Sequence, residues 1–354
     1  MQRRSLLKRI LQVSGGFIGA NLIMGGCGQQ GRSRDLMFML NLRSAETPLP
    51  KHLVTAVGDF YVQSYGLPVA VNADTWKLEI TGAVAQPLTL TLAEILAAPQ
   101  DNFYLTMECI GNPTGGDQIG NALWQGTALL PFLQRAQVKP EATDWLLHGA
   151  DSYETNLPVA ALMQPEVRLV HQMNGAPLTK EHGYPMRIIV PGRFGQKQPK
   201  WLVKLEAIAR PKQGYWERQG WSNTAEIPTH SMIRQVQGDR VWNRRNSVTL
   251  EKSGDLGWDL GILIAGVALD KNSPIQRIEV STDAGQTWHQ AEHNTPPSPH
   301  EWTLWRYTWT PDRPGKYTLL ARAQTAKQTQ PLEDGDRQDG SAGILKIYVT
   351  LNAA

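Results

Sequence analysis

The stretch Phe103–Gly116, which reads FYLTMECIGNPTGG, decides how this 354-residue chain is interpreted. Its first half is apolar and rich in aromatic and β-favouring residues, so it predicts a strand over 103–110. That strand runs into a glycine-rich loop with Cys109 at its beginning. Because glycines let a backbone approach other groups closely, we expect N–H groups of the loop to approach the sulfur and lower the pKa of the thiol. Cys109 is therefore the first candidate for a functional residue.

The cysteine count makes Cys109 more informative. The chain has two cysteines, and the other one, Cys27, lies at the end of a segment that we interpret as an export signal. The body of the chain then holds a single thiol and neither a CxxC nor a CxxCH motif, which argues against a zinc ribbon, a c-type haem and a cysteine-ligated iron–sulfur cluster. A lone cysteine is more often a small buried hydrophobe. A structural cysteine and a Cys–His hydrolase nucleophile therefore stay as alternatives.

The N-terminus has the pattern of a targeting segment. Arg3-Arg4-Ser5-Leu6-Leu7-Lys8 is a twin-arginine start, and a weakly apolar stretch with several glycines follows it. The stretch is too short for a membrane span and resembles a Tat signal, which bacteria read as an export address. Met24-Gly25-Gly26-Cys27 resembles a lipoprotein box, so Cys27 is a candidate lipid anchor. We predict a signal over 1–27, a linker over 28–50 and a periplasmic or cell-envelope location; a basic, disordered N-terminus is the alternative.

Composition fits a globular protein of about two domains. Hydrophobic residues make up 41% of the chain and charged residues 19%. The net charge is +3, and lysine and arginine are spread out, which argues against a nucleic-acid partner. No internal repeat marks a solenoid.

The hydrophobic pattern divides the body into two domains. Residues 51–230 mix strand and helix patterns, and Thr91 with Glu94 predicts a capping box at the start of a short helix. Strands are predicted over 76–91, 103–110, 145–148, 167–173 and 186–190, and a second short helix over about 128–135. Residues 231–354 lack helical patterns. Their strand-like runs, near 247–250, 261–268, 275–281, 301–309, 316–323 and 344–351, predict an all-β sandwich of the immunoglobulin type.

Several motifs in a fixed order resemble the sulfite oxidase family of molybdenum enzymes. In the first domain these motifs are Glu108–Pro113, Leu123–Leu129, Asn174-Gly175 and His182–Gly195, followed by Lys200-Trp201. In the second domain Ile278–Trp288, Leu320–Ala323 and Gln330-Pro331 are similar to the family's dimerisation module. The resemblance covers about residues 55–350. It implies an α+β sulfite-oxidase-type molybdopterin-binding domain, then an immunoglobulin-like domain, a molybdenum–molybdopterin cofactor and a homodimer.

The resemblance also implies roles for individual residues. Cys109 would be the one protein thiolate on the metal, and a soft sulfur ligand suits such a centre. Asp151, His182, Arg187 and Lys200 fall on cofactor-contacting positions of the family, and Ser64 and Tyr65 lie in the early strand that reaches the site. Arg193 and Lys197 are further basic candidates for the phosphate of the pterin. Taken alone, Asp151 could be a turn residue, and Arg187 could be a surface charge.

The chain departs from sulfite oxidases around the substrate. Gln63 and Tyr65 stand where those enzymes have Arg and His, and Pro113-Thr114 stand where their cysteine loop carries two Arg. An anionic substrate such as sulfite needs clustered positive charge. Arg193, Arg218 and Arg234 are candidates to replace it, and Trp221 is aligned loosely with an active-site Tyr. The departures therefore weaken the assignment of sulfite, but they leave the cofactor unchanged.

The sequence predicts a molybdopterin-dependent oxidoreductase that carries out two-electron oxygen-atom transfer on a small oxyanion, with sulfur oxyanions as the first choice. Because the chain carries no haem motif, the electrons would pass to a separate carrier, either a cytochrome or a quinone-linked protein. One alternative is a reductase of sulfoxides or other oxidised groups. Another is a cofactor-free binding protein.

Overall fold

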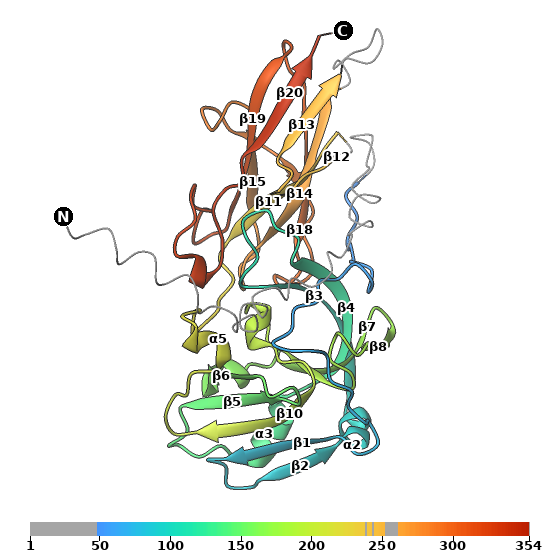
Figure 1. Ribbon diagram of the computed structural model, residues 1–354, viewed down its shortest axis with the longest axis vertical. Helices are drawn as coiled ribbons and strands as arrows, with labels where there is room; N and C mark the ends of the chain where they lie inside the picture. The colour runs from blue at the N-terminus through green and yellow to red at the C-terminus, as the bar shows by residue number, and fades with distance from the viewer. Residues whose placement is uncertain (1–47, 238, 243, 252–260, 354) are drawn as a thin grey trace, which may run out of the picture.

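The computed structural model describes residues 48–237, 239–242, 244–251 and 261–353. The predicted signal over 1–27, Cys27 and most of the predicted linker lie outside these residues. Within them, strands predominate over short helices, and no helix is long and apolar enough to cross a membrane. Figure 1 shows an elongated molecule, with β1 and β2 at one end, β19 and β20 at the other, and β3 and β4 between them.

The first sheet forms the end of the molecule away from the C-terminus (Figure 1). Its strand order is β2-β1-β10-β5-β6. The strands are β1 (Lys77–Gly82), β2 (Leu88–Thr91), β5 (Asp144–Gly149), β6 (Glu154–Pro158) and β10 (Leu202–Ile208). Its core includes Leu78 and Ile80, which alternate with more exposed residues on β1 as a half-buried strand requires.

Three short helices accompany this sheet. They are α2 (Leu92–Ala97), α3 (Leu130–Ala136) and α4 (Val159–Leu162). The predicted capping box of α2 is confirmed, because the Thr91 hydroxyl accepts from the Glu94 backbone N–H and the Glu94 carboxylate accepts from the Thr91 N–H. Both predicted helices are therefore present. The sequence analysis did not predict β6 or β10, although β10 is central to this sheet.

A second sheet carries the cysteine loop. Its order is β3-β4-β7-β8, with β9 paired to β7. The strands are β3 (Gln100–Glu108), β4 (Ile119–Ala128), β7 (Arg168–Met173), β8 (Ala176–Pro177) and β9 (Arg187–Ile189). The antiparallel register of β3 and β4 ends on the pair Glu108 and Ile119, so Cys109 is the first residue of the loop between them. The predicted strand over 103–110 therefore ends two residues early, and β4 was not predicted as a strand.

The second half of the chain contains two further sheets. One has the order β12-β11-β14-β18-β17 and the other β13-β20-β19-β15-β16. The strands are β11 (His230–Val236), β12 (Asp239–Arg240), β13 (Ser247–Glu251), β14 (Ile262–Leu269), β15 (Arg277–Ser281), β16 (His289–Gln290), β17 (Glu292–His293), β18 (Thr303–Trp309), β19 (Gly315–Gln324) and β20 (Ile347–Asn352). One apolar core contains residues of both sheets, and β13 pairs with β20 in parallel. The immunoglobulin type stays a prediction.

The two halves of the chain pack tightly against each other. Thr106 of β3 donates its backbone N–H to His300 O at 2.9 Å, and its hydroxyl oxygen accepts from Trp302 N at 2.8 Å. One apolar cluster joins Leu53 and Ile119 to Met232 and other residues of the second half. Because Ile119 ends the loop that begins at Cys109, this contact lies close to the predicted site.

Candidate cofactor site

Cys109 lies at the point where β3 ends and its loop begins. Its backbone N–H donates to Gln118 O at 3.0 Å, which closes the loop across its base. The side chain is partly accessible. Burial nevertheless raises the pKa of the thiol to about 11, and the N–H groups of Gly111 and Asn112 lower it by less. The expected N–H contacts are therefore present, but the expected lowering of the thiol pKa is wrong for the cofactor-free protein, because burial outweighs them.

Gly111 keeps the space beside the thiol open. A Cβ at this position would stand 3.5 Å from the Trp221 ring and 3.9 Å from Cys109 Sγ. Any larger side chain would therefore enter the space between the ring and the sulfur. The sequence placed Trp221 only loosely, and the structure brings its indole next to the cysteine loop.

Arg187, on β9, is a buried cation with 4% of its surface exposed. In the part of the chain that the structure describes, its hydrogen bonds go to His182 O, Gln198 O and Met107 Sδ, none of which is negatively charged. Its Nε has no hydrogen-bond partner there. Burial lowers the pKa of the guanidinium to about 10. A buried cation with only neutral partners is costly in water-free surroundings, so this position fits an anionic ligand.

Lys200 lies beside Arg187 and is a partly buried cation whose hydrogen bonds also go to uncharged oxygens. Its Nζ donates to Ser64 Oγ at 2.7 Å and to Glu181 O at 2.8 Å. Burial, followed by repulsion from Arg187, lowers the pKa of Lys200 to about 7. Gly183 has a φ of +106°, and a Cβ there would stand 3.0 Å from Lys200 Cβ and 3.3 Å from Arg187 Cβ. This glycine therefore allows the two cations to lie side by side.

His182 and Asp151 complete the predicted set. The Nε2 of His182 lies 3.3 Å from Val57 O. Burial, followed by repulsion from Arg187, lowers the pKa of His182 to about 4, so its imidazole is neutral at pH 7. Asp151 accepts from Tyr153 N at 3.1 Å. Burial raises its carboxyl pKa, and the charge of Lys200 opposes that rise, which places Asp151 near the cationic pair.

Tyr61 is a site residue that the sequence analysis missed. Burial and the nearby Cys109 thiol raise its pKa well above the usual value, and Arg187 opposes them. Tyr61 therefore lies near both the thiol and Arg187. Its position two residues before Gln63 was the available signal. Tyr65, by contrast, is 44% exposed, and its ring packs against Tyr215 with centroids 4.5 Å apart.

The remaining basic candidates are occupied by other partners. Arg193 donates to Thr224 O at 2.6 Å and pairs with Glu226 at 3.2 Å, and no described contact joins it to the other candidates. Lys197 is fully buried and pairs with Glu217. Its role is therefore in the packing of α5 (Tyr215–Arg218) and η1 (Gly195–Lys197).

The other two arginines considered as substitutes for the missing charge also have protein partners. Arg218 donates to Gln213 O at 2.6 Å at the protein surface. Arg234 is buried and donates to the carbonyl oxygens of Gly115 and Gly116, at 3.4 and 2.5 Å. The charge with the largest effect on the Cys109 thiol is negative and belongs to Glu108. These contacts give the thiol surroundings of low positive charge.

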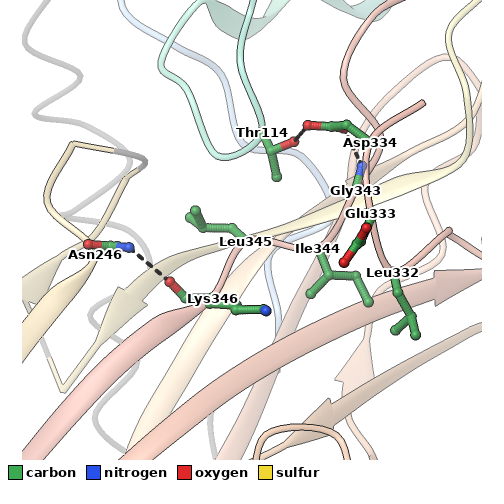
Figure 2. Close-up of a pocket in the computed structure, with 9 residues that line it drawn as sticks. All are labelled: Thr114, Asn246, Leu332, Glu333, Asp334, Gly343, Ile344, Leu345 and Lys346. Carbon is green, nitrogen blue, oxygen red and sulfur yellow. Dashed lines mark hydrogen bonds between the residues drawn. The ribbon is translucent and has the colours of Figure 1, made fainter. Parts of the chain in front are cut away.

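The outer side of the cysteine loop faces the second half of the chain. Figure 2 shows the Thr114 hydroxyl bonded to Asp334, at a pocket of about 330 Å³ that is lined also by Leu345 and Lys346. The pocket contains none of the predicted cofactor residues. Thr114, which stands where sulfite oxidases have an Arg, therefore makes a contact with the second domain.

The residues fit an anionic cofactor that binds a soft metal. They offer one thiol, a buried arginine and a partly buried lysine that form no ion pair with a carboxylate in the described part of the chain, and a partly buried carboxylate acceptor. The model of the oxidoreductase molybdopterin binding domain matches residues 65–216. The mitochondrial sulfite oxidase of Drosophila melanogaster is 28% identical over 284 residues, which cover 70% of this chain and 49% of that protein. Sulfite oxidase of Arabidopsis thaliana is 26% identical over 308 residues, or 73% of this chain and 74% of that protein.

Residues 65–216 therefore match a molybdopterin-binding domain of oxidoreductases, and most of the chain is similar to sulfite oxidases. This similarity implies a molybdenum–molybdopterin cofactor, as the sequence predicted. In fold, the chain matches the sulfane dehydrogenase SoxCD from Paracoccus pantotrophus with a TM-score of 0.67 and 22% identity, over 84% of this chain and 81% of that one. The chain spans about half of the length of the Drosophila relative. The roles of individual residues stay predictions.

Proposed function

We propose that this protein carries out two-electron oxygen-atom transfer at a small sulfur compound and exchanges electrons with a separate carrier. The observation that carries the proposal is the joint placement of Cys109 with the buried Arg187 and the partly buried Lys200, which form no ion pair with a carboxylate among the described residues. When bound, the molybdenum cofactor would supply the oxygen-atom and electron chemistry.

The protein residues would bind and orient this cofactor. Cys109 would hold the metal through sulfur. Arg187 and Lys200 would hold its phosphate, and Ser64 would keep the lysine ammonium in place through their 2.7 Å hydrogen bond. Asp151 would accept hydrogen bonds from pterin N–H groups. His182, which is neutral at pH 7 and donates its one N–H to Val57 O, would offer Nδ1 as an acceptor without adding charge.

Two substrate classes are open to this site. A sulfur oxyanion is the first candidate, because relatives over most of the chain are sulfite oxidases. A neutral sulfoxide is the second, because Arg193, Arg218 and Arg234 are held by other partners and Trp221 lies beside the loop. Oxidation of sulfite would take its oxygen from water and release two electrons and two protons. Reduction of a sulfoxide would consume the same electrons and protons and release water.

One experiment tests the cofactor and the reaction together. The protein is expressed in a host that makes the cofactor, and molybdenum and pterin are measured. Sulfite oxidation is then assayed with an artificial electron acceptor, and sulfoxide reduction with a reduced dye. We expect about one molybdenum per chain, as a single cofactor with one protein thiolate implies. A protein without molybdenum and pterin would refute the proposal and leave the cofactor-free binding protein.

We also propose that the protein is exported by the twin-arginine route and works in the periplasm or at the cell envelope, as a homodimer. The support is the sequence pattern around Arg3 and Arg4, with Cys27 as the candidate lipid anchor. Replacing both arginines by lysine should leave the protein in the cytoplasm after cell fractionation. Unchanged export would contradict the route.

A further inference from the structure

We propose that the second half of the chain positions the metal-ligand loop, and that His230 and Arg234 on β11 are positioning residues for Cys109. This inference rests on the proposed role of Cys109. It adds that the β-sandwich half, besides any part in a dimer, is needed to set the geometry of the cofactor site.

The first link is a buried ion pair directly behind the ligand. Glu108, which precedes Cys109 in the chain, lies 3.1 Å from His230 Nε2, and the side chains are 1% and 3% exposed. The other nitrogen of His230 lies 2.9 Å from Pro228 O. A carbonyl only accepts, so Nδ1 carries a proton, and the protonated ring faces the Glu108 carboxylate as an ion pair. The ion pair therefore fixes Glu108 relative to β11.

Glu108 in turn holds the loop through Asn112. Its Oε1 accepts from Asn112 Nδ2 at 2.8 Å, and Asn112 Oδ1 accepts from Gln118 N at 3.0 Å. The N–H of Asn112 also donates to Cys109 O at 2.9 Å. Asn112 thus ties the beginning of the loop to its end. A shift of the Glu108 carboxylate would move the turn that carries the Cys109 sulfur.

The second link holds the far side of the same loop. Arg234, four residues after His230, donates to the carbonyl oxygens of Gly115 and Gly116. Asp334 accepts from the Thr114 hydroxyl at 2.7 Å, and its other oxygen accepts from the backbone N–H groups of Ala342 and Gly343 (Figure 2). The second half of the chain therefore contacts the loop both at its beginning, through Glu108, and on its far side, through Thr114 to Gly116.

The strand β11, which carries His230 and Arg234, is itself held in place by its neighbours. It pairs with β14 along six residue pairs from His230 to Val236, and Ser231 N donates to the buried Gln330 Oε1 at 2.8 Å. Partners of a metal ligand that fix its orientation typically change metal affinity or activity by about 10- to 100-fold when removed. A contact that only joined two domains would change stability and leave the ligand unaffected.

The chain offers a matched control for this distinction. His52 bonds to Glu301 at 2.9–3.0 Å, and Glu301 accepts from Asn121 Nδ2 at 3.0 Å. This is a second His–Glu–Asn network between the two halves, and none of its members adjoins Cys109 in the sequence.

The experiment compares His230→Leu, His230→Gln and His52→Leu in a full chain that carries Cys27→Ser. Cofactor-free protein is treated with a thiol reagent, and the rate at which Cys109 reacts is measured together with Tm. We expect His230→Leu to raise that rate by about tenfold or more, and His230→Gln to restore most of the original rate, since its amide can still donate to Glu108. His52→Leu should lower Tm but leave the rate within about twofold.

Equal rate changes in the two leucine variants would overturn the proposal, as would no change in either. If His230→Leu does not fold, Arg234→Lys and Arg234→Gln replace it, and the lysine variant should react more slowly than the glutamine variant. The thiol assay needs no metal. Positioning and the proposed function can therefore fail separately: a chain that binds no molybdenum but shows the His230 effect refutes only the function.

Discussion

Two His–Glu–Asn networks join the halves of this molecule, and they differ in what the glutamate adjoins. The loop network is made of His230, Glu108 and Asn112, and the strand network of His52, Glu301 and Asn121. The donor types and bond lengths are similar. Only in the loop network is the glutamate next to the metal-ligand candidate, with the asparagine in the same loop. The same chemistry can therefore serve contact alone or contact and positioning, and its location decides which.

The two networks also differ in the direction in which the pKa of a member favours charge. Burial lowers the pKa of His230, but Glu108 and Pro228 together raise it by more, so the net shift is upward and favours the protonated histidine. In the strand network burial raises the pKa of the Glu301 carboxyl, which brings it closer to accepting a proton. Burying separated charges is expensive, and a pair of this kind specifies a geometry more than it adds stability. The more deeply buried ion pair, His230–Glu108, which costs more free energy to bury, lies next to Cys109.

We expect the largest effect from replacing Cys109, the residue that the loop network holds in place. Cys109→Ser should lower turnover by more than about 100-fold, because loss of a ligand exceeds the effect of losing one of its supporting contacts. The protein should still fold, since serine has nearly the same size and shape as cysteine. Activity and molybdenum content are measured beside the strand-network variant His52→Leu. Full activity in Cys109→Ser would refute the ligand assignment and remove the functional difference between the networks.

The next effect separates binding of the cofactor from stability. Lys200→Met should lose most of its molybdenum and yet raise the Tm of the cofactor-free protein at pH 6. The folded-state pKa of Lys200 is about 7 against an ordinary 10.5. Below pH 7 the lysine is charged in both states and its burial costs stability; between pH 7 and 10.5 the folded protein releases the proton first, and stability rises with pH.

The measurement is Tm of cofactor-free protein at pH 6 and pH 10. Wild-type Tm minus variant Tm should increase between these values, and a difference that does not depend on pH would contradict the assigned burial. Neither network touches Lys200 directly, so variants of both should keep this dependence.

The sequence singled out candidate cofactor residues but not the contacts that would hold them in place. Cys109, Arg187 and Lys200 stood in recognisable motifs, and each motif is a local stretch of chain. The partners of the loop network lie far apart in the sequence, and neither β11 nor β4 showed a pattern that predicted a strand. Thr114 and Arg234 were considered only as present or missing charge. Their hydrogen bonds depend on how two domains pack, which local pattern does not encode.

A smaller effect compares the networks on stability alone. Glu108→Ala should lower the free energy of unfolding by about 3 kcal/mol or more, because it removes one partner of a buried ion pair. Glu301→Ala should cost about 1–2 kcal/mol, since His52 is more exposed and can be rehydrated. Denaturant unfolding of both cofactor-free proteins gives the values. Equal costs would show that the two networks do not differ in charge separation.

The smallest expected effect concerns Asp283, which lies outside both networks and serves as a control for the loss of stability at low pH. Burial raises the pKa of Asp283, but the hydrogen bonds from Thr287 and Ser281 together outweigh it and lower the pKa to about 2. Its contribution to stability is therefore complete above its ordinary pKa of 3.8 and is lost as the pH falls through 2. Asp283→Asn should lower Tm by a small amount at pH 5 and by less at pH 2.5. Because this turn lies in the second half but does not contact β11, its loss should leave the reaction rate of the Cys109 thiol unchanged. A raised rate would mean that any weakening of the second half loosens the loop, and the distinction between the two networks would fail.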